Sequence, residues 1–257
     1  SILTRLQREP LAKCTAPGKA KDYIQHCRRR RASVSSSTVM GDIVFLRGVL
    51  AYAKPGWELA DVTDAPLREA LPVLKKERLI SQSKRRTRCP SGLETKQIAD
   101  YFRLRKQTRA ADIVEFQDDS TRRISETCEM LWVNLDPATK TIIIRNMKHP
   151  RIKEGNDRRV ALPQKSFDII MRQPRLTSSK EERIFPVNSR TMQAAYRRAV
   201  RACGFKDLHL HDSRRGGTTR LLEQGYSVPK VMLVTGHIPP TMVLTTYNGM
   251  RPEEFHK

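Results

Sequence analysis

Residues 209–225, HLHDSRRGGTTRLLEQG, place His211, Arg214 and Arg215 within five positions at the start of a predicted helix. Arginine offers planar, permanently charged donors that match the oxygens of a phosphate group. The crowding therefore favours a site built to hold one phosphate. The alternative is an ordinary basic helix end on a very basic protein, and the rest of the chain has to decide between the two.

The overall charge favours a polyanionic partner. The 257-residue chain has 49 Lys and Arg against 27 Asp and Glu, a formal net charge of +22, and both halves of the chain carry a basic surplus. This charge predicts binding to nucleic acid, with both halves on the same duplex. A membrane surface is the rival polyanion, but no apolar run approaches the roughly 18–20 residues of a spanning helix, and no signal peptide opens the sequence.

The five cysteines are scattered along the chain and show no CxxC spacing. They support neither a zinc ribbon nor a disulfide framework. Reduced thiols are typical of a cytoplasmic or nucleoid-associated protein. We therefore expect that compartment, and no membrane partner.

Changes in composition divide the chain into four segments. Residues 1–32 show no clear periodicity and end in a run of arginines, so we expect an irregular, basic N-terminal segment. Residues 33–80 predict a small helical domain. Residues 81–92, rich in Ser, Pro, Lys and Arg, predict a basic linker that can follow DNA phosphates. Residues 93–257 form a second, larger domain.

Apolar positions at three- and four-residue steps predict two helices in the first domain. One begins at the serine-rich cap of residues 35–38 and ends at Pro55-Gly56, and the other spans residues 65–78. Ser91 is a cap candidate for the first helix of the second domain.

The second domain begins as helical sequence and changes period near residue 131. Residues 132–135, 141–145 and 159–162 predict short strands of a three-stranded antiparallel sheet. Further helices are predicted at 164–172, 189–203, 212–224, 228–236 and 240–247. The fold class is therefore mainly α with a small antiparallel β-sheet, a helical domain in front of a mixed α+β domain.

The chemistry of a DNA phosphodiester determines which groups a protein would need in order to cleave it. A phosphodiester resists attack because its oxygens repel nucleophiles, and the transition state adds further charge to them. A protein site therefore needs fixed donors for those oxygens, a nucleophile, and an acid for the departing sugar oxygen.

Five motifs follow one another along the second domain. In order, they are TRRISETCEMLWVNLD (121–136), IIIRNMKHPRIKEGNDRRVALP (142–163), HDSRRGG (211–217), LVTGHIPP (233–240) and LTTYNGM (244–250). Each motif alone is weak, but the ordered set resembles the catalytic domain of the tyrosine recombinases, the phage-integrase family. The resemblance covers roughly residues 91–250, and the helical domain in front is only loosely similar to the core-binding domain of that family.

The resemblance implies a set of site residues. It places the first arginine at Arg123, with Glu126 three residues on as a supporting carboxylate, and a lysine at the turn of the hairpin. The implied catalytic residues are Arg123, Lys148, His211, Arg214, His237 and Tyr247.

The resemblance also implies a mechanism and partners. Tyr247 attacks the scissile phosphate to form a covalent 3′-phosphotyrosine, the two arginines hold the non-bridging oxygens, and Lys148 protonates the leaving 5′-oxygen. His211 handles the tyrosine proton, and His237 donates to the phosphate or orients its neighbours. The reaction needs no ATP, metal or other cofactor. The expected partners are double-stranded DNA and three further copies of the chain in a homo-tetramer on DNA, with accessory DNA-bending proteins as optional additions.

Alternatives remain for several of these residues. Arg122 lies beside Arg123 but outside the Ile-Ser-Glu register, and Lys153 is the second candidate for the acid. Tyr196 and Tyr226 are weaker nucleophile candidates because neither follows a Gly-His motif. For the helix start we expect Asp212 as the cap, and His209 as a bystander.

Two other functions also fit parts of the pattern. A type IB topoisomerase-like nicking-closing enzyme shares the chemistry, and a DNA-binding protein with an unused site shares the charge. The sequence departs from the family at Ser213, where Leu is usual, and in the spacing of His237 and Tyr247, ten residues apart. The ten residues after Tyr247 predict a short or absent exchange helix.

Overall fold

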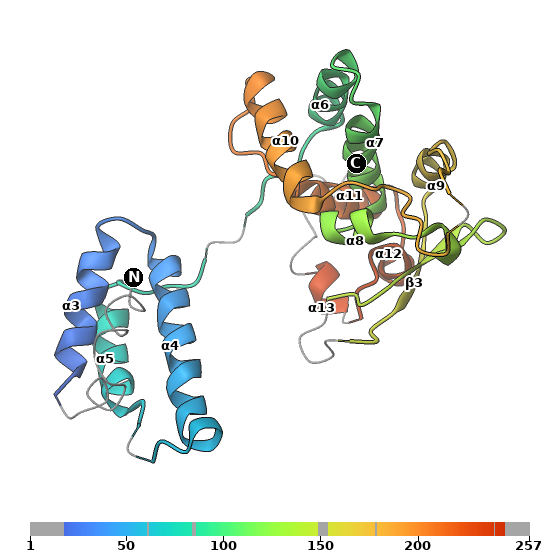
Figure 1. Cartoon of the computed structure of the whole chain (residues 1–257). Coiled ribbons are helices and arrows are strands. Elements are labelled where there is room, and N and C mark those ends of the chain that lie inside the picture. The colour runs from blue at the N-terminus through green and yellow to red at the C-terminus, as the bar shows by residue number, and fades with distance from the viewer. Residues whose placement is uncertain are drawn as a thin grey trace. The chain divides into compact units, whose positions relative to one another are not determined.

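A computed structural model describes residues 18–60, 62–83, 86–148, 154–177, 179–238 and 240–244. The chain divides into two compact units, Ser1–Arg85 and Arg86–Lys257, each with its own hydrophobic core (Figure 1). Among the described residues, no helix is both long and apolar enough to cross a membrane.

The first unit is helical in its described part. It contains α3 (Ala20–Arg31), α4 (Ser36–Trp57) and α5 (Ala65–Lys76). Ser35 caps α4 by accepting a hydrogen bond from the backbone N–H of Thr38, as its sequence position predicts. The buried core of the unit includes Tyr23, Cys27, Val39, Ile43, Leu46, Leu50, Leu67 and Leu74.

Two details of this unit differ from expectation. The irregular segment predicted for residues 1–32 is wrong for its second part, because residues 20–31 form α3. Only Ala20, Tyr23 and Cys27 face the core among many basic residues, so the helical period is easy to miss. The next helix, α4, also continues through Pro55 instead of stopping there; since Pro55 lies in the last turn, its missing N–H disturbs only the helix end.

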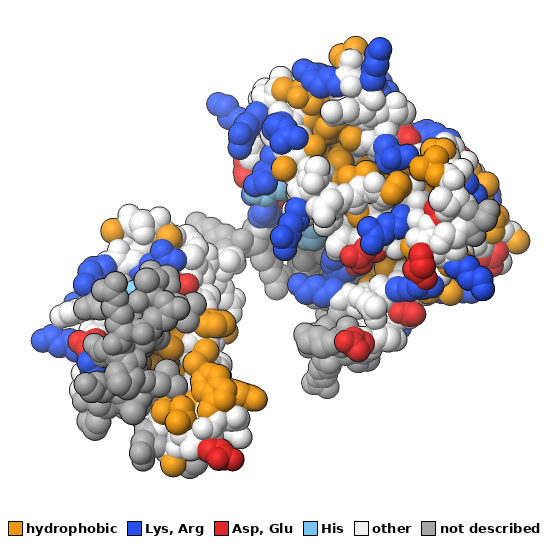
Figure 2. Space-filling model, in the orientation of Figure 1, with side chains coloured by type: hydrophobic (Ala, Val, Ile, Leu, Met, Phe, Trp, Pro, Cys, Tyr) orange, Lys and Arg blue, Asp and Glu red, His pale blue; other side chains and the backbone are white. Residues whose placement is uncertain are grey.

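Figure 2 shows where charged and hydrophobic side chains lie on one face of each unit. Lys and Arg are spread over both units, and exposed hydrophobic side chains gather on α4. The four large exposed hydrophobic residues of this helix are Val44, Phe45, Tyr52 and Trp57.

The second unit is mainly helical with a small antiparallel sheet, which confirms the predicted fold class. Its helices are α6 (Gly92–Leu104), α7 (Thr108–Ser120), α8 (Ile124–Glu129), α9 (Gln164–Met171), α10 (Ser189–Ala202), α11 (Asp212–Glu223), α12 (Val228–Thr235) and α13 (Pro240–Met242). Ser91 caps α6 in a capping box with Glu94, as predicted.

The sheet has the strand order β1-β2-β3, with β1 at Leu135–Asp136, β2 at Thr141–Ile144 and β3 at Arg158–Ala161. Ile142 pairs with Val160, and both side chains are buried. The first predicted strand is largely wrong: residues 132–134 form a 3-10 turn, because Trp132 turns into the core just before the chain enters the sheet.

A close contact between α11 and α7 positions the site. A Cβ atom at Gly217 would lie 2.4 Å from the backbone oxygen of Asp118, so only glycine lets the two helices approach this closely. The contact holds the start of α11 beside the end of α7, where the chain continues into Arg122 and Arg123.

Candidate active site

Arg123 and Glu126 form one local unit at the start of α8. Arg123 is the N-cap residue; its backbone N–H donates to Glu126 Oε2 over 3.1 Å, and its Nη1 donates to Glu126 Oε1 over 2.5 Å. Only half of a capping box is present, because Glu126 accepts from the N-cap N–H while an arginine side chain has no acceptor for the N–H of Glu126. Glu126 is buried while the Arg123 side chain stays partly exposed, so the buried carboxylate orients a guanidinium that solvent can reach.

Arg214, in the first turn of α11, is 1% exposed and joins three segments of the unit. Its Nη1 donates to the backbone oxygen of Thr121 over 2.7 Å, and its Nη2 donates to the backbone oxygen of Thr235 over 3.3 Å. The same Nη2 lies 2.8 Å from His237 Nε2. Arg214 therefore connects α11 with the chain before α8 and with the end of α12.

His237 follows Gly236, which ends α12 in the left-handed conformation (φ 70°). A guanidinium has no acceptor, so the Nε2 of His237 must be the unprotonated nitrogen that accepts from Arg214. Its Nδ1–H then donates to Thr235 Oγ1, 2.9 Å away. Burial, and then the charges of Arg214, Arg123 and Arg122, lower the pKa of His237 to about 3, so the ring is neutral at physiological pH.

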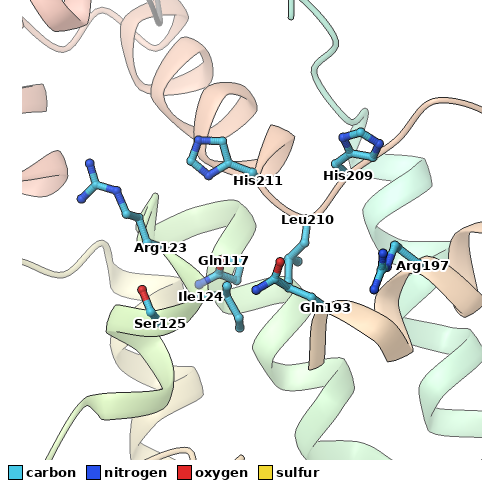
Figure 3. A pocket seen from close by; sticks show the side chains of 9 residues that line it. All are labelled: Gln117, Arg123, Ile124, Ser125, Gln193, Arg197, His209, Leu210 and His211. Atoms are coloured by element: carbon cyan, nitrogen blue, oxygen red, sulfur yellow. The ribbon is translucent and has the colours of Figure 1, made fainter. Parts of the chain in front are cut away.

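His211 and Arg123 line the same pocket, which has a volume of about 490 Å³ (Figure 3). His211 is the N-cap residue of α11, and burial followed by the charges of Arg214 and Arg123 lowers its pKa. In Figure 3, His211 lies on the Arg123 side of Leu210 and His209 lies on the other side. The full lining is Gln117, Arg123, Ile124, Ser125, Gln193, Arg197, His209, Leu210 and His211.

Lys148 is exposed and follows Met147 in the connection between β2 and β3. Met147 is held by Asn156, whose backbone oxygen accepts from the Met147 N–H over 2.9 Å and whose Nδ2 donates to the Met147 oxygen over 2.6 Å. The Met147 side chain lies against Gly236, where an added Cβ would be 2.6 Å from Met147 Cε. The residue before Lys148 thus contacts the residue before His237.

The remaining predicted residues have different outcomes. Tyr247 and Lys153 lie outside the described residues. Tyr196 is 1% exposed and its pKa is strongly raised, chiefly by burial, so it is a poor nucleophile candidate. Tyr226 is exposed, beyond the end of α11. Within the described part of the chain, no group of three or more His, Cys, Asp or Glu side chains is arranged to hold a metal ion.

The structure corrects the role expected for Asp212. The N-cap of α11 is His211, and the Asp212 carboxylate accepts instead from the His209 N–H and from Arg86, whose Nε and Nη2 donate over 3.0 and 2.8 Å. Arg86 also donates to Asp207. Nothing in the sequence signals this contact, because the partners are more than a hundred residues apart.

Sequence reasoning also missed Arg122. The sequence motif favours Arg123, but Arg122 is the more buried of the two arginines, with 1% of its surface exposed. The only signal available was two adjacent arginines in a stretch that must turn into the core.

Comparisons with known proteins identify the family of the chain. The family model described as "Phage integrase family" matches residues 93–254. A Haemophilus influenzae protein named "Putative integrase/recombinase" is 25% identical over 262 residues, covering 99% of this chain and 68% of its own length. A second Haemophilus influenzae protein of the same name is 24% identical over 152 residues, and the chain spans 48% of its length.

Solved structures show the same fold. The Tn1549 transposon integrase in complex with circular intermediate DNA has a TM-score of 0.69 at 14% identity, covering 99% of this chain and 89% of that chain. A lambda integrase tetramer bound to a Holliday junction has a TM-score of 0.53 at 16% identity, covering 97% and 78%. The chain belongs to the phage integrase family, which makes it a tyrosine site-specific recombinase by family.

Proposed function

We propose that the chain cleaves and rejoins double-stranded DNA at specific sites through a covalent 3′-phosphotyrosine on Tyr247. The observation that carries the proposal is the convergence of Arg123, His211, Arg214 and His237. These residues come from separate segments, and Arg123 and Arg214 both face Glu126. Two arginines and two neutral imidazoles around one point suit a phosphate that gains negative charge during reaction.

Each residue then has a defined task. Arg123 and Arg214 hold the non-bridging oxygens. The Oη of Tyr247 attacks phosphorus while the bond from phosphorus to the 5′-oxygen breaks. The tyrosine proton passes to His211, whose lowered pKa keeps it able to accept one, and Lys148 gives a proton to the 5′-oxygen. Rejoining reverses these transfers, so the reaction consumes no ATP and needs no metal.

His237 has a conditional role in this proposal. Its Nε2 accepts from Arg214 in the free protein, so it can donate to a phosphate oxygen only after that hydrogen bond opens and the ring takes up a proton or changes tautomer. The simpler role is to orient Arg214. We expect the first role to need a bound phosphate, and the second to hold in its absence.

The polar lining of the pocket supports duplex DNA as the substrate. Gln193 and Arg197 of α10 extend the site away from Arg123 and His211, as Figure 3 shows, and can donate to backbone or base oxygens. Exchange between two sites requires two duplexes and four strand cleavages, so we propose a homo-tetramer on DNA, to which accessory DNA-bending proteins can add.

The direct test uses a nicked suicide duplex made from the DNA that flanks the coding sequence. The protein should become covalently linked to the 3′-phosphate and release a short 5′-hydroxyl strand, and the Tyr247→Phe variant should form no link. A wild-type protein that forms no adduct, or a Tyr247→Phe protein that does, contradicts the proposal. Relaxation of supercoiled plasmid without joining of two sites would favour a nicking-closing enzyme instead.

A further inference from the structure

Arg122 is a buried arginine directly behind the candidate phosphate site. Its side chain is 1% exposed; its Nε donates to the backbone oxygen of Ser120 over 3.3 Å, and its Nη2 donates to the backbone oxygen of Val234. Among the described residues, its Nη1 atom is buried without a hydrogen-bond partner. Burial, opposed by Glu126 and assisted by the charges of Arg214 and Arg123, lowers the pKa of Arg122 to about 9, so the group is still charged at neutral pH.

The carboxylate of Glu126 lies close to the guanidinium groups of three arginines. Glu126 Oε1 is 2.5 Å from Arg123 Nη1, and Glu126 Oε2 is 3.9 Å from Arg122 Nη1 and 4.0 Å from Arg214 Nη1. Burial alone would raise the pKa of Glu126, but the three guanidinium groups lower it, so it is ionised. Three positive charges against one negative charge leave an excess of two in a mostly buried cluster.

The excess matches the chemistry proposed for the site. A phosphodiester carries one negative charge, and the five-coordinate transition state formed by an attacking tyrosinate carries about two. A buried charge that lacks a counter-charge is costly to the free protein, and an anion that arrives beside it recovers that cost. The charge of Arg122 therefore interacts with more negative charge while the phosphate is being attacked than before the attack.

Arg122 also holds the segment that carries His237. Val234, whose oxygen accepts from Arg122, lies in the last turn of α12, three residues before His237. Thr235 and Gly236 complete the turn, and Arg214 binds the oxygen of Thr235. Two arginines from different elements thus bind consecutive carbonyl groups at the end of this helix, where the helix dipole is negative.

We propose that Arg122 is a positioning residue of the strand-cleavage reaction, which holds the end of α12 and supplies the third positive charge that balances the transition state. It acts through Arg214, Glu126 and His237 and does not contact the substrate. The inference rests on the proposed function, since it presupposes a phosphate at this site. An apolar side chain would fill the same buried position without a desolvation cost, but it would leave the oxygens of Ser120 and Val234 without these donors, so the charge and the hydrogen bonds need separate tests.

The test separates charge from packing. Arg122→Leu removes the charge and the hydrogen bonds, and Arg122→Lys keeps the charge but loses the planar donor set. We expect Arg122→Leu to slow formation of the covalent adduct in single turnover by roughly 10–100-fold, with DNA affinity within about threefold of wild type, because a buried donor acts on the transition state. Arg122→Lys should recover at least half of the lost rate on a logarithmic scale.

A duplex with one methylphosphonate at the scissile position provides the charge readout. Replacing a non-bridging oxygen with methyl removes one negative charge from the phosphate and from its transition state, so the third arginine has less to balance. On this duplex the wild-type and Arg122→Leu rates should differ by no more than about threefold, because Arg122 then has less negative charge to stabilise. The matched control is Arg220→Leu, because Arg220 also donates to backbone oxygens, of Pro90 and Asp118, away from Glu126. Its loss should be the same on both duplexes.

The outcomes are distinct. If wild type forms no adduct on the ordinary duplex, the proposed function fails, and the inference with it. If wild type reacts and Arg122→Leu reacts equally fast, or loses the same factor on both duplexes, the inference alone is overturned. Two results would make the Arg122→Leu comparison unusable: no cleavage of the methylphosphonate duplex, or an Arg122→Leu protein that does not unfold cooperatively. In either case the inference is judged from the rate of Arg122→Lys on the ordinary duplex. A rate within tenfold of wild type supports the inference, and a slower rate overturns it.

Discussion

At the scale of single residues, the hydrogen bond between Arg214 and His237 determines how the free protein responds to acid. Burial, and then the charges of Arg214, Arg123 and Arg122, lower the pKa of His237 from 6.5 to about 3, so the folded protein resists protonation of this ring. The unfolded chain binds that proton at an ordinary pKa. Protons therefore favour the unfolded chain between these two values.

We expect the free energy of unfolding to fall as the pH is lowered from about 6.5 towards about 3, and His237→Asn to lose less stability over this window than wild type. Each pKa unit corresponds to about 1.4 kcal/mol at most. Urea denaturation at pH 7 and pH 4.5, without DNA, measures the difference. Equal losses for both proteins would show that His237 is not held in its neutral form.

The residue scale also shows what the sequence could reveal about the site. The resemblance carried by the sequence motifs predicts Arg123, His211 and Arg214 as site residues with Glu126 as a supporting carboxylate, and in the structure Arg123 and His211 are the N-cap residues of α8 and α11. Arg122 could not be distinguished from Arg123 by type. Which of two adjacent arginines faces the core depends on how the loop after α7 turns, and contacts distant in sequence determine that turn.

At the scale of elements, the packing of α11 on α7 depends on one glycine of an adjacent pair. A Cβ at Gly217 would meet the backbone oxygen of Asp118 at 2.4 Å, whereas a Cβ at Gly216 would meet the side chains of Pro90 and Arg220 at 3.1 and 3.2 Å. Backbone cannot move away as a flexible side chain can. Two neighbouring positions of one helix should therefore differ strongly in their tolerance of alanine.

We expect Gly217→Ala to destabilise the protein by roughly 2–4 kcal/mol, because it forces α11 away from α7. Gly216→Ala should fall within about 1 kcal/mol of wild type, since a gain in helix propensity offsets a tight side-chain contact. Thermal unfolding of the two variants gives the comparison. A mild effect at position 217 would mean that the helices are not held this close.

The contact between Arg86 and Asp212 joins the beginning of the second unit to the start of α11. Asp212 is 4% exposed, and it accepts two hydrogen bonds from Arg86 and one from the His209 N–H. Hydrogen bonds to a charged group contribute about 1.5–3 kcal/mol each when one partner is removed. Removing either side chain should therefore lower the free energy of unfolding, and removing both should cost less than the sum of the two effects.

We expect Arg86→Ala and Asp212→Asn each to lower stability by about 1–3 kcal/mol, and the double variant to lose less than the sum of the two. Denaturant unfolding of all four proteins closes the cycle. Additive losses would show that the two side chains do not interact in solution. Lys96→Ala is a suitable control, because Lys96 pairs with Asp100 on the surface of the same unit, where an ion pair contributes little.

At the scale of the whole molecule, two separate cores and a distributed positive charge are the main features. The buried core residues of the first unit lie between Ala20 and Ile80, and the main core of the second lies between Ile98 and Leu210, so the two share no residue. Periodicity in the sequence predicted most helices and the sheet. It did not predict α3, because the apolar positions of this helix are few.

The net charge of +22 leads to a prediction for DNA binding. If six to ten phosphates are contacted, affinity should fall by about 10³–10⁵ between 50 and 200 mM salt, because bound counterions are released. Fluorescence anisotropy with a labelled duplex over that range measures the slope. A nearly flat response would contradict binding through the backbone by both units.

The engagement of Arg214 with His237 has a consequence for an enzyme that would search a chromosome for its site. A strongly basic chain meets random DNA phosphates constantly, and the proposed function makes each of them a target for unwanted cleavage. The Nη2 group of Arg214 already donates to Thr235 and faces His237, so a passing phosphate must first displace an existing partner. Only a duplex held in place long enough by its other contacts can complete that exchange. Under the proposed function, we therefore expect this hydrogen bond to slow strand cleavage at phosphates that the protein contacts only briefly while it moves along DNA.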